Sequence, residues 1–253
     1  MRPSLTDPRT VVYGLAHLLL IAIGFLCINL SFPLSKEVGA SLVAAGITGM
    51  VVFVYVSVSE RRSQLVGLLR EFGFVAAFEA RASKIRGEYD SRLASASDSI
   101  DIMGFGLSAM RQDYQGDFAS WAARATVRIL LLDPTHPSAE LSNASQRDLE
   151  ESERAGTIAG QVQDFVHATR DLVRQDSRFQ IRLYTCLPSI NIFRVDDELF
   201  WGPYLVKQYS RNTPTFIVKR GGVLFRRIVE HFDAVWNDNT LSRPVPAEWL
   251  EAE

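Results

Sequence analysis

Two long runs without a charged residue occupy the N-terminal part of the chain and restrict its fold more than any other feature. They cover 10–35 and 38–59 and are separated by the charged pair Lys36-Glu37. Each run exceeds the roughly 20 apolar residues that a helix needs to cross a bilayer core. Two such runs in tandem disfavour buried helices of a soluble domain, and the first is too long for a signal peptide. We therefore expect a transmembrane hairpin over 1–59, with spans at about 11–33 and 38–59.

Basic residues flank this hairpin on its outer side. Arg2 and Arg9 precede the first run, and Arg61, Arg62 and Arg70 follow the second, whereas the turn carries only Lys36. The positive-inside rule places such flanks in the cytoplasm. The sequence thus predicts a multi-pass protein of the inner (plasma) membrane with both termini cytoplasmic and the lipid bilayer as its first partner.

Small residues recur along the second run. Ser41, Ala45 and Gly49 are four residues apart, with Gly46 beside them. Such a stripe lets helices approach closely. It would either pack the hairpin on itself or pair two protomers, and the pattern alone leaves both alternatives open.

The remaining composition excludes several classes of protein. The net charge of −2 disfavours a generally basic nucleic-acid binder. The two cysteines, Cys27 and Cys186, suggest no disulfide framework. Histidines and cysteines do not occur at metal-ligand spacing, so we expect neither a metal nor a cofactor.

Residues 60–97 show an amphipathic helical pattern after the hairpin. Apolar residues recur at helical spacing, first over 65–72 and then over 78–93. Several arginines make its beginning basic, and the first few would touch anionic headgroups. Beyond the first turn, a solvated face with Glu71, Glu79 and Glu88 as partners is the better expectation. We expect one membrane-proximal helix over 60–97.

A soluble α/β domain is expected over 98–240, followed by a tail over 241–253. Its order is β-α-β-α-β-β-β-β-α, which implies a mixed sheet between helices. The expected strands are 99–106, 126–134, 178–188, two around the turn at Asp196-Asp197, and 213–220; the expected helices are 110–125, 158–173 and 222–238.

The segment "SINIFRVDDELFWGPY" (189–204) has the spacing of a known catalytic motif. It resembles one half-unit of the phospholipase D superfamily, whose motif is His-x-Lys-x-x-x-x-Asp followed by Gly-Ser. Ser189, Asn191 and Asp196 take these three places, and Gly202-Pro203 falls near the Gly-Ser position. The preceding strand-helix-strand unit and the closing helix are also similar, so the resemblance covers roughly 78–240.

The departures from this motif change the expected chemistry. In the family the histidine attacks phosphorus and the lysine holds phosphate oxygens; here Ser189 and Asn191 stand in their places. A serine needs a base within hydrogen-bond reach to act as a nucleophile, and none is adjacent in sequence. Asn191 supplies no positive charge for a phosphoryl transition state. The half-unit looks degenerate, and we assign no catalytic residue.

Three histidines could in principle replace the missing base. His136 follows a strand end, whereas His167 and His231 lie in expected helices. A structural role is the better expectation for each of them.

The resemblance implies a pocket where the motif strand meets the glycine turn after the first strand. Arginines on strands suit a phosphate or carboxylate, although carboxylate neighbours such as Asp197 and Glu198 would explain them equally. The candidate ligand-binding residues are Gly104, Gly106, Ser108, Asp133, Arg182, Ser189, Asn191, Arg194, Asp196 and Tyr204.

These features favour a membrane-anchored, non-catalytic phospholipase D-like sensor that binds a phosphorylated small molecule or a protein partner. Because the family builds its site from two half-units, the resemblance also implies a homodimer. Related architectures occur in bacterial signalling and phage defence, which is an analogy only. Two alternatives stay open: a phosphodiesterase, nuclease or phospholipase with an atypical residue set, and a membrane scaffold that recruits a partner.

Overall fold

A computed structural model describes residues 8–30, 34–138 and 140–251. The chain divides into two compact units, Met1–Leu68 and Leu69–Glu253, which are described separately. The expected first span ended at residue 33, and its last three positions lie outside the described residues.

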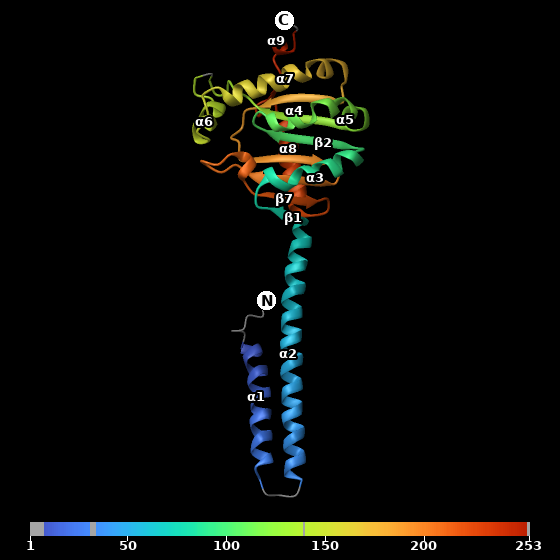
Figure 1. Ribbon diagram of the computed structural model, residues 1–253, viewed down its shortest axis with the longest axis vertical. Helices are drawn as coiled ribbons and strands as arrows, with labels where there is room; N and C mark the ends of the chain where they lie inside the picture. Colours follow the sequence, from blue (N-terminus) through green and yellow to red (C-terminus); the bar gives the residue numbers. More distant parts are fainter. Residues whose placement is uncertain (1–7, 31–33, 139, 252–253) are drawn as a thin grey trace. The chain divides into compact units, whose positions relative to one another are not determined.

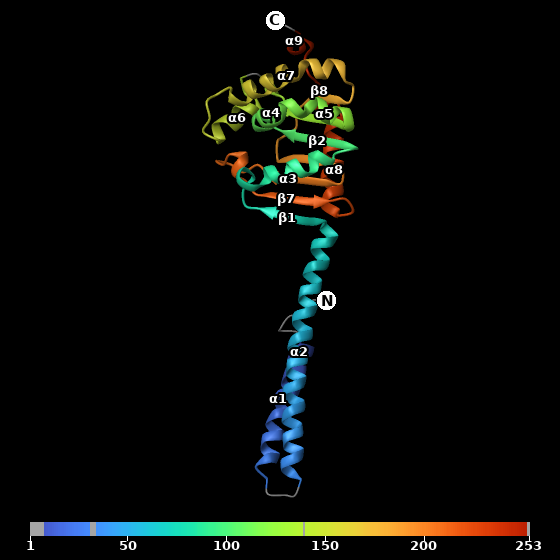
Figure 2. The same cartoon turned by 45° about the vertical axis from the view of Figure 1, so that its right-hand side comes forward.

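The N-terminal unit is a helical hairpin. It consists of α1 (Pro8–Ile28) and most of α2 (Ser35–Phe72), and both helices are long and apolar enough to cross a membrane. The mean hydropathy is 2.5 over Val11–Ile28 and reaches 2.1 in α2. Figures 1 and 2 show the two helices side by side.

Glycines of α2 allow this close approach. A Cβ on Gly46 would lie 2.5 Å from the Ile21 side chain, and a Cβ on Gly49 would lie 2.3 Å from the His17 ring. Ser41 and Ala45, in contrast, are exposed. The glycines of the small-residue stripe therefore pack the hairpin on itself, which is the first of the two alternatives.

The segment 60–97 is not the single helix expected from its apolar periodicity. Helix α2 ends at Phe72, the chain turns at Gly73 with φ of 78°, and β1 (Phe74–Phe78) and α3 (Arg81–Ser95) follow. Only glycine adopts that backbone conformation without strain. A Cβ on Gly222 would lie 2.4 Å from the Gly73 Cα. Two glycines therefore make the joint at which the chain changes from helix to sheet.

The C-terminal unit is built on one mixed sheet of eight strands, which confirms the α/β fold class. The strand order is β1-β7-β6-β5-β2-β3-β4-β8. The pairs β2–β3 and β3–β4 are parallel, and every other pair is antiparallel. The other strands are β2 (Ser99–Gly104), β3 (Thr126–Leu132), β4 (Phe179–Tyr184), β5 (Ile190–Val195), β6 (Glu198–Pro203), β7 (Thr215–Lys219) and β8 (Ser242–Pro244).

Helices cover both faces of this sheet, and in Figures 1 and 2 α8 lies on the opposite side from α3, α4, α5 and α7. Tyr89 of α3 packs edge-on against Phe193 and Phe200, with ring centroids 4.5 and 4.8 Å apart. On the other face, the Arg128 guanidinium lies 4.9 Å from the Phe232 ring of α8. The bounds of these helices are α4 (Ser108–Tyr114), α5 (Phe118–Arg124), α7 (Thr157–Gln175) and α8 (Val223–Asn237).

The domain is larger than the expected 98–240 at both ends. It includes β1 and α3 before residue 98, and β8 and α9 (Ala247–Leu250) lie in the expected tail. Strand β8 pairs with β4, with Arg182 opposite Pro244. The polar segment 135–156, which the sequence leaves as either a loop or a loosely held helix start, contains the helix α6 (Asn143–Glu150). The short elements α6, β8 and α9 lack the periodicity that would reveal them.

Candidate functional site

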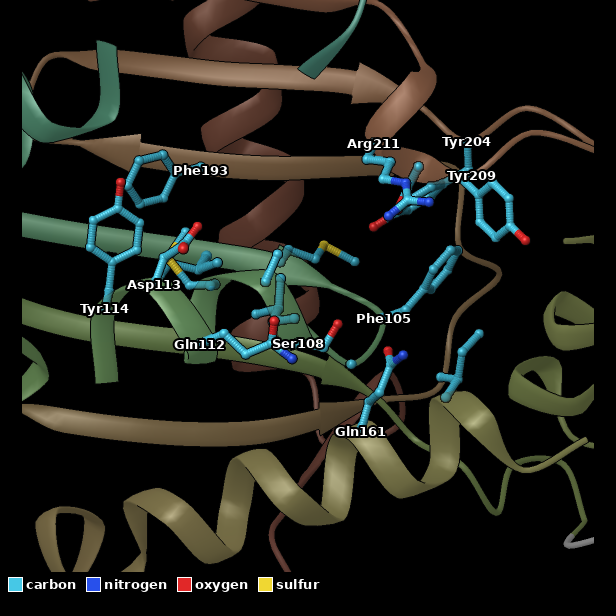
Figure 3. A pocket seen from close by; sticks show the side chains of 18 of the residues that line it. Phe105, Ser108, Gln112, Asp113, Tyr114, Gln161, Phe193, Tyr204, Tyr209 and Arg211 are labelled. Atoms are coloured by element: carbon cyan, nitrogen blue, oxygen red, sulfur yellow. The ribbon is translucent and has the colours of Figure 1, made fainter. Parts of the chain in front are cut away.

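A cavity of about 640 Å³ opens beside the carboxyl end of β2. Figure 3 shows its walls: α7 below, the β2–α4 turn in the middle, and the segment after β6 above. Its volume lies within the range typical of small-molecule sites. The side chains used in the argument below are Phe105, Ser108, Gln161, Tyr204, Tyr209 and Arg211.

Two glycines shape the floor of this cavity. A Cβ on Gly106 would lie 2.3 Å from the Gln161 Cβ of α7. A Cβ on Gly104 would lie 2.5 Å from the Leu107 side chain and 3.5 Å from the Tyr204 hydroxyl. Side chains at these positions would therefore push α7 and the Leu107 side chain away. The glycine turn belongs to the site because the absence of side chains lets Gln161 and Leu107 pack closely against the backbone of the turn.

A stacked aromatic pair forms one wall. The Phe105 and Tyr204 rings are 3.9 Å apart and inclined by 21°. The Arg147 guanidinium of α6 lies over both rings, 5.3 and 5.7 Å from their centroids. It also donates to the carbonyls of Leu205 at 3.0 Å and Gln208 at 2.8 Å. Arg147 thus holds the wall and the segment after β6 together.

Several polar groups face the cavity with unused hydrogen-bonding capacity. Within 8–30, 34–138 and 140–251, no side-chain hydrogen bond is formed by Ser108, Gln161 or the Tyr209 hydroxyl, nor by the Arg211 guanidinium. In Figure 3 Gln161 points from α7 toward Phe105, and Arg211 points from above toward the same space. Arg211 lies 5.1 Å from the Tyr209 ring centroid. These donors and acceptors are available to a bound molecule.

The structure brings only some of the predicted residues to this cavity. Gly106, Ser108 and Tyr204 line it, and Gly104 shapes its floor. Ser189 is exposed, and its carbonyl accepts a hydrogen bond from the Tyr204 amide at 3.0 Å. Ser189 therefore borders the site through its backbone.

Asn191 is buried and does not line the cavity. It is 4% exposed, and its side-chain amide donates to the Gly202 carbonyl at 3.0 Å. A Cβ on Gly202 would lie 2.4 Å from the Pro214 carbonyl oxygen. The motif's Asn and Gly therefore fit each other across two paired strands, and this contact is structural.

The remaining predicted residues lie away from the cavity. Arg194 donates to Asp101 at 2.9 Å beneath α8. Arg182 donates to Ser242 Oγ at 2.9 Å and to Asn239 at 2.8 Å, which holds β8 against β4. Both guanidiniums therefore have partners within the fold and are not directed at a ligand.

Asp133 is likewise engaged within the fold. Its carboxylate is 1% exposed and accepts from Arg243 Nε at 2.5 Å and from the Thr135 amide at 2.9 Å. Burial alone would raise the pKa of Asp133, but the hydrogen bonds from Arg243 and Thr135 outweigh it and lower this pKa. Asp133 fixes the chain after β3.

Asp196 caps the turn at the far end of β5 from Ser189. It adopts φ of 49°, and its carboxylate accepts from the amides of Ser97, Asp98 and Ser99 at 3.0, 2.9 and 2.9 Å. Partial burial would raise the pKa of Asp196, but these three backbone hydrogen bonds outweigh it and lower the pKa. The motif's aspartate is therefore a structural cap.

This cap predicts a pH dependence. Because the folded pKa of Asp196 lies below its unfolded value of about 3.9, its contribution to stability is present above that value and is lost as the pH falls through the folded pKa. We expect Asp196→Ala to lower the thermal unfolding midpoint at pH 7. We also expect this midpoint to decrease less on acidification in the variant than in the wild type. The neighbouring Asp197→Ala is the matched control, since Asp197 forms only an exposed pair with Arg220. Parallel pH profiles of Asp196→Ala and wild type would contradict this role.

The histidines do not contribute to the cavity. His136 and His167 are exposed, and His231 lies half-buried on α8, where burial lowers its pKa. Within the described segments, no group of three or more His, Cys, Asp or Glu side chains is placed to hold a metal. The described lining residues thus include no imidazole that could act as a base.

Comparisons with known proteins identify a family and distant structural neighbours. Residues 72–244 match a family described as "Domain of unknown function (DUF5919)". No curated protein matches the sequence. Among solved structures, the chain is similar to the archaeal chromatin protein TrmBL2, with 13% identity, a TM-score of 0.42, and 90% of this chain and 81% of that chain covered.

Two further solved structures show a similar degree of likeness. NucT from Helicobacter pylori has 10% identity and a TM-score of 0.38, with 67% of this chain and 98% of that chain covered. Phosphatidylserine synthase from Haemophilus influenzae Rd KW20 has 10% identity and a TM-score of 0.45, with 73% of this chain covered. The match spans 42% of the length of the synthase.

Proposed function

The chain belongs to the DUF5919 family, and from this premise we propose that it is a membrane-anchored, phospholipase D-like module that binds a phosphorylated small molecule without cleaving it. The observation that carries the proposal is the cavity beside β2, with Arg211, Gln161 and Ser108 facing it. A guanidinium and neutral donors around an aromatic wall are suited to a phosphate attached to an organic group.

The motif geometry supports a binding role over catalysis. Ser189 is exposed at the position where the phospholipase D motif has its nucleophilic histidine. The Asn191 side-chain amide, at the position of the motif's lysine, donates to the Gly202 carbonyl. Phosphoryl transfer needs an activated nucleophile and positive charge at the transition state. Neither Ser189 nor Asn191 supplies them.

The placement of the domain is part of the proposal. The hairpin would anchor the protein in the inner membrane, with both termini and the domain in the cytoplasm, as the distribution of basic residues indicates. Ligand binding would be reported toward the hairpin, because α3 contributes Arg86 and Tyr89 to the cavity and follows β1 directly. A homodimer remains an expectation from the resemblance.

The binding test uses the full chain in detergent micelles and isothermal titration calorimetry. The probes are nucleoside monophosphates, sugar phosphates and inorganic phosphate. We expect at least one organic phosphate to bind and Arg211→Gln to weaken it about 10- to 100-fold, as for hydrogen bonds to charged groups. Arg227→Gln is the matched control, because Arg227 is exposed on α8 and pairs with Glu230.

Two results would overturn the proposal. Absence of binding by every phosphorylated probe would favour the scaffold alternative. Steady cleavage of bis(p-nitrophenyl) phosphate by the purified chain would favour the phosphodiesterase alternative, provided that it is lost on Ser189→Ala.

A further inference from the structure

The charges around the cavity restrict the ligand more narrowly than the cavity's size does. Within the described residues, the lining includes three carboxylates, from Asp113, Glu151 and Glu153, and two guanidiniums, from Arg86 and Arg211. Arg147, which lies over the aromatic wall and pairs with Glu151, adds one positive charge, and its second partner Glu150 adds one negative charge. Three positive and four negative charges then leave a net charge of −1 around the cavity. A ligand with several negative charges would meet net repulsion in this space.

Only one of these cations is free of a carboxylate partner. Arg86 pairs with Asp113 at 3.2 Å. In the described part of the chain Arg211 has no ion-pair partner and contacts the Tyr209 ring. The cavity therefore offers a single guanidinium that is not already paired.

The beginning of α7 does not add a second anion site. Thr157 and Ile158 line the cavity at this helix terminus. The Asp148 carboxylate accepts from the Gly156 amide at 2.8 Å and from the Ile158 amide at 3.1 Å. Because a buried carboxylate already occupies these donors, the terminus holds its own negative charge and disfavours another.

The rest of the lining combines aliphatic side chains with aromatic rings and a few neutral polar groups. The Phe105–Tyr204 pair and Tyr209 present ring surfaces to the cavity, and aromatic pairs favour stacked or edge-on contacts with other rings. Gln161 offers both a donor and an acceptor, and Ser108 offers a hydroxyl. Such groups suit the edge of a planar heterocycle.

We infer that this cavity takes a ligand with a planar heterocyclic ring and a single negative charge. The inference rests on the proposed function, since it concerns the same cavity. The negative charge would lie at Arg211, and the ring would lie against the aromatic wall with its edge toward Gln161. A ringless phosphate and a polyanionic nucleotide would both bind more weakly.

The test compares probes that vary the negative charge of an adenosine ligand with a singly charged phosphate diester that lacks the ring. They are adenosine, adenosine 3′,5′-cyclic monophosphate, adenosine 5′-monophosphate, adenosine triphosphate and the ringless diester diethyl phosphate. We expect the singly charged cyclic nucleotide to bind about 10-fold or more tightly than each of the others, measured by calorimetry on the full chain in micelles.

Removal of one lining carboxylate should change this preference. Glu153→Gln is expected to reduce the ratio between the singly and doubly charged nucleotides about 3- to 10-fold, because it removes a repulsive charge at nearly constant volume. Glu230→Gln on α8, outside the cavity, should leave the ratio unchanged.

The outcomes separate this inference from the proposed function. Tighter binding of the monophosphate or triphosphate, or equal binding of diethyl phosphate, would overturn the inference while the proposed function stands. An unchanged ratio in Glu153→Gln would overturn the assignment of the charge preference to this lining. Failure of every phosphorylated probe to bind would overturn both.

Discussion

Replacement of Asp101 by Asn is expected to lower the free energy of unfolding by about 3–5 kcal/mol. Asp101 is 1% exposed and lies between two arginines on the α8 face of the sheet. Its carboxylate accepts from Arg128 Nε at 2.7 Å and from Arg194 Nη1 at 2.9 Å. Without this charge, two guanidiniums would remain beneath α8 with insufficient compensation.

The pKa of Arg128 shows how strongly this arginine interacts with its carboxylate partners. Burial alone would lower the pKa of Arg128, but the hydrogen bond and the charge of Asp101, with Asp233 at 2.9 Å, outweigh it and raise this pKa. The cation therefore gains more from its carboxylate partners than it loses by leaving water. Removal of the shared partner, Asp101, reverses this balance.

Thermal unfolding of the full chain in micelles, followed by circular dichroism, measures the effect. Asp197→Asn is the matched control because Asp197 and Arg220 form an exposed pair, for which about 0–1 kcal/mol is expected. Asp101→Asn should leave the affinity of the cavity unchanged below the unfolding transition, since the network lies on the opposite face of the sheet. A loss below 1 kcal/mol would mean that water stabilises the two arginines in place of Asp101.

This network also explains what the sequence could not show about Arg194. The sequence allowed either a ligand role or a carboxylate neighbour such as Asp197 or Glu198. The true partner, Asp101, lies 93 residues earlier in the chain. Pairing of β2 with β5 places Asp101 opposite Arg194, and only the strand register reveals that contact.

Much of the fold was predictable because the apolar periodicity of long segments indicates both the type of element and its buried face. The apolar runs of α1 and α2, the buried strand β3 and the amphipathic helices α7 and α8 all follow their patterns. Strand β1 was missed because its sequence, FVAAF, continues the apolar spacing of α2 across Gly73. The change from helical to strand geometry depends on the contact between Gly73 and Gly222, which lie far apart in sequence.

The cavity was predictable only in part, for a related reason. The glycine turn and Tyr204 were found because the resemblance implied that the motif strand meets the turn after the first strand. Gln161, Tyr209 and Arg211 were missed because a helix face and a polar loop carry no motif. Conversely, the resemblance included Asp196 in the site although its carboxylate caps a turn at the other end of the strand.

The second large effect is expected from Arg147 of helix α6, in the polar segment between β3 and α7. Its side chain is 6% exposed, pairs with Glu150 and Glu151 at 3.0 and 2.7 Å, and binds two carbonyls of the segment after β6. Arg147→Ala should cost about 3 kcal/mol of unfolding free energy, because it leaves partly buried carboxylates unpaired. Arg147→Lys should rescue it only in part, since one ammonium cannot reproduce the planar fork.

A local measurement distinguishes the loss of this clamp from general destabilisation. Lys207 is exposed in the clamped segment, so trypsin cleavage after it reports local opening. We expect Arg147→Ala to raise the cleavage rate at Lys207 at least about 10-fold, because two hydrogen bonds from a charged group are lost. Cleavage at Arg227, on helix α8, requires unfolding of the domain and should therefore remain slower than cleavage at Lys207 in the same variant.

The same variant connects the clamp to the cavity. Tyr204, Tyr209 and Arg211 all lie in or beside the segment that Arg147 holds, so its release should weaken binding of cyclic adenosine monophosphate in proportion to the opening at Lys207. Arg154→Ala is the control, because Arg154 is exposed just beyond α6 and its side chain forms no hydrogen bond or ion pair with the described residues. If affinity falls while Lys207 stays protected, Arg147 acts on the ligand directly and not through the segment after β6.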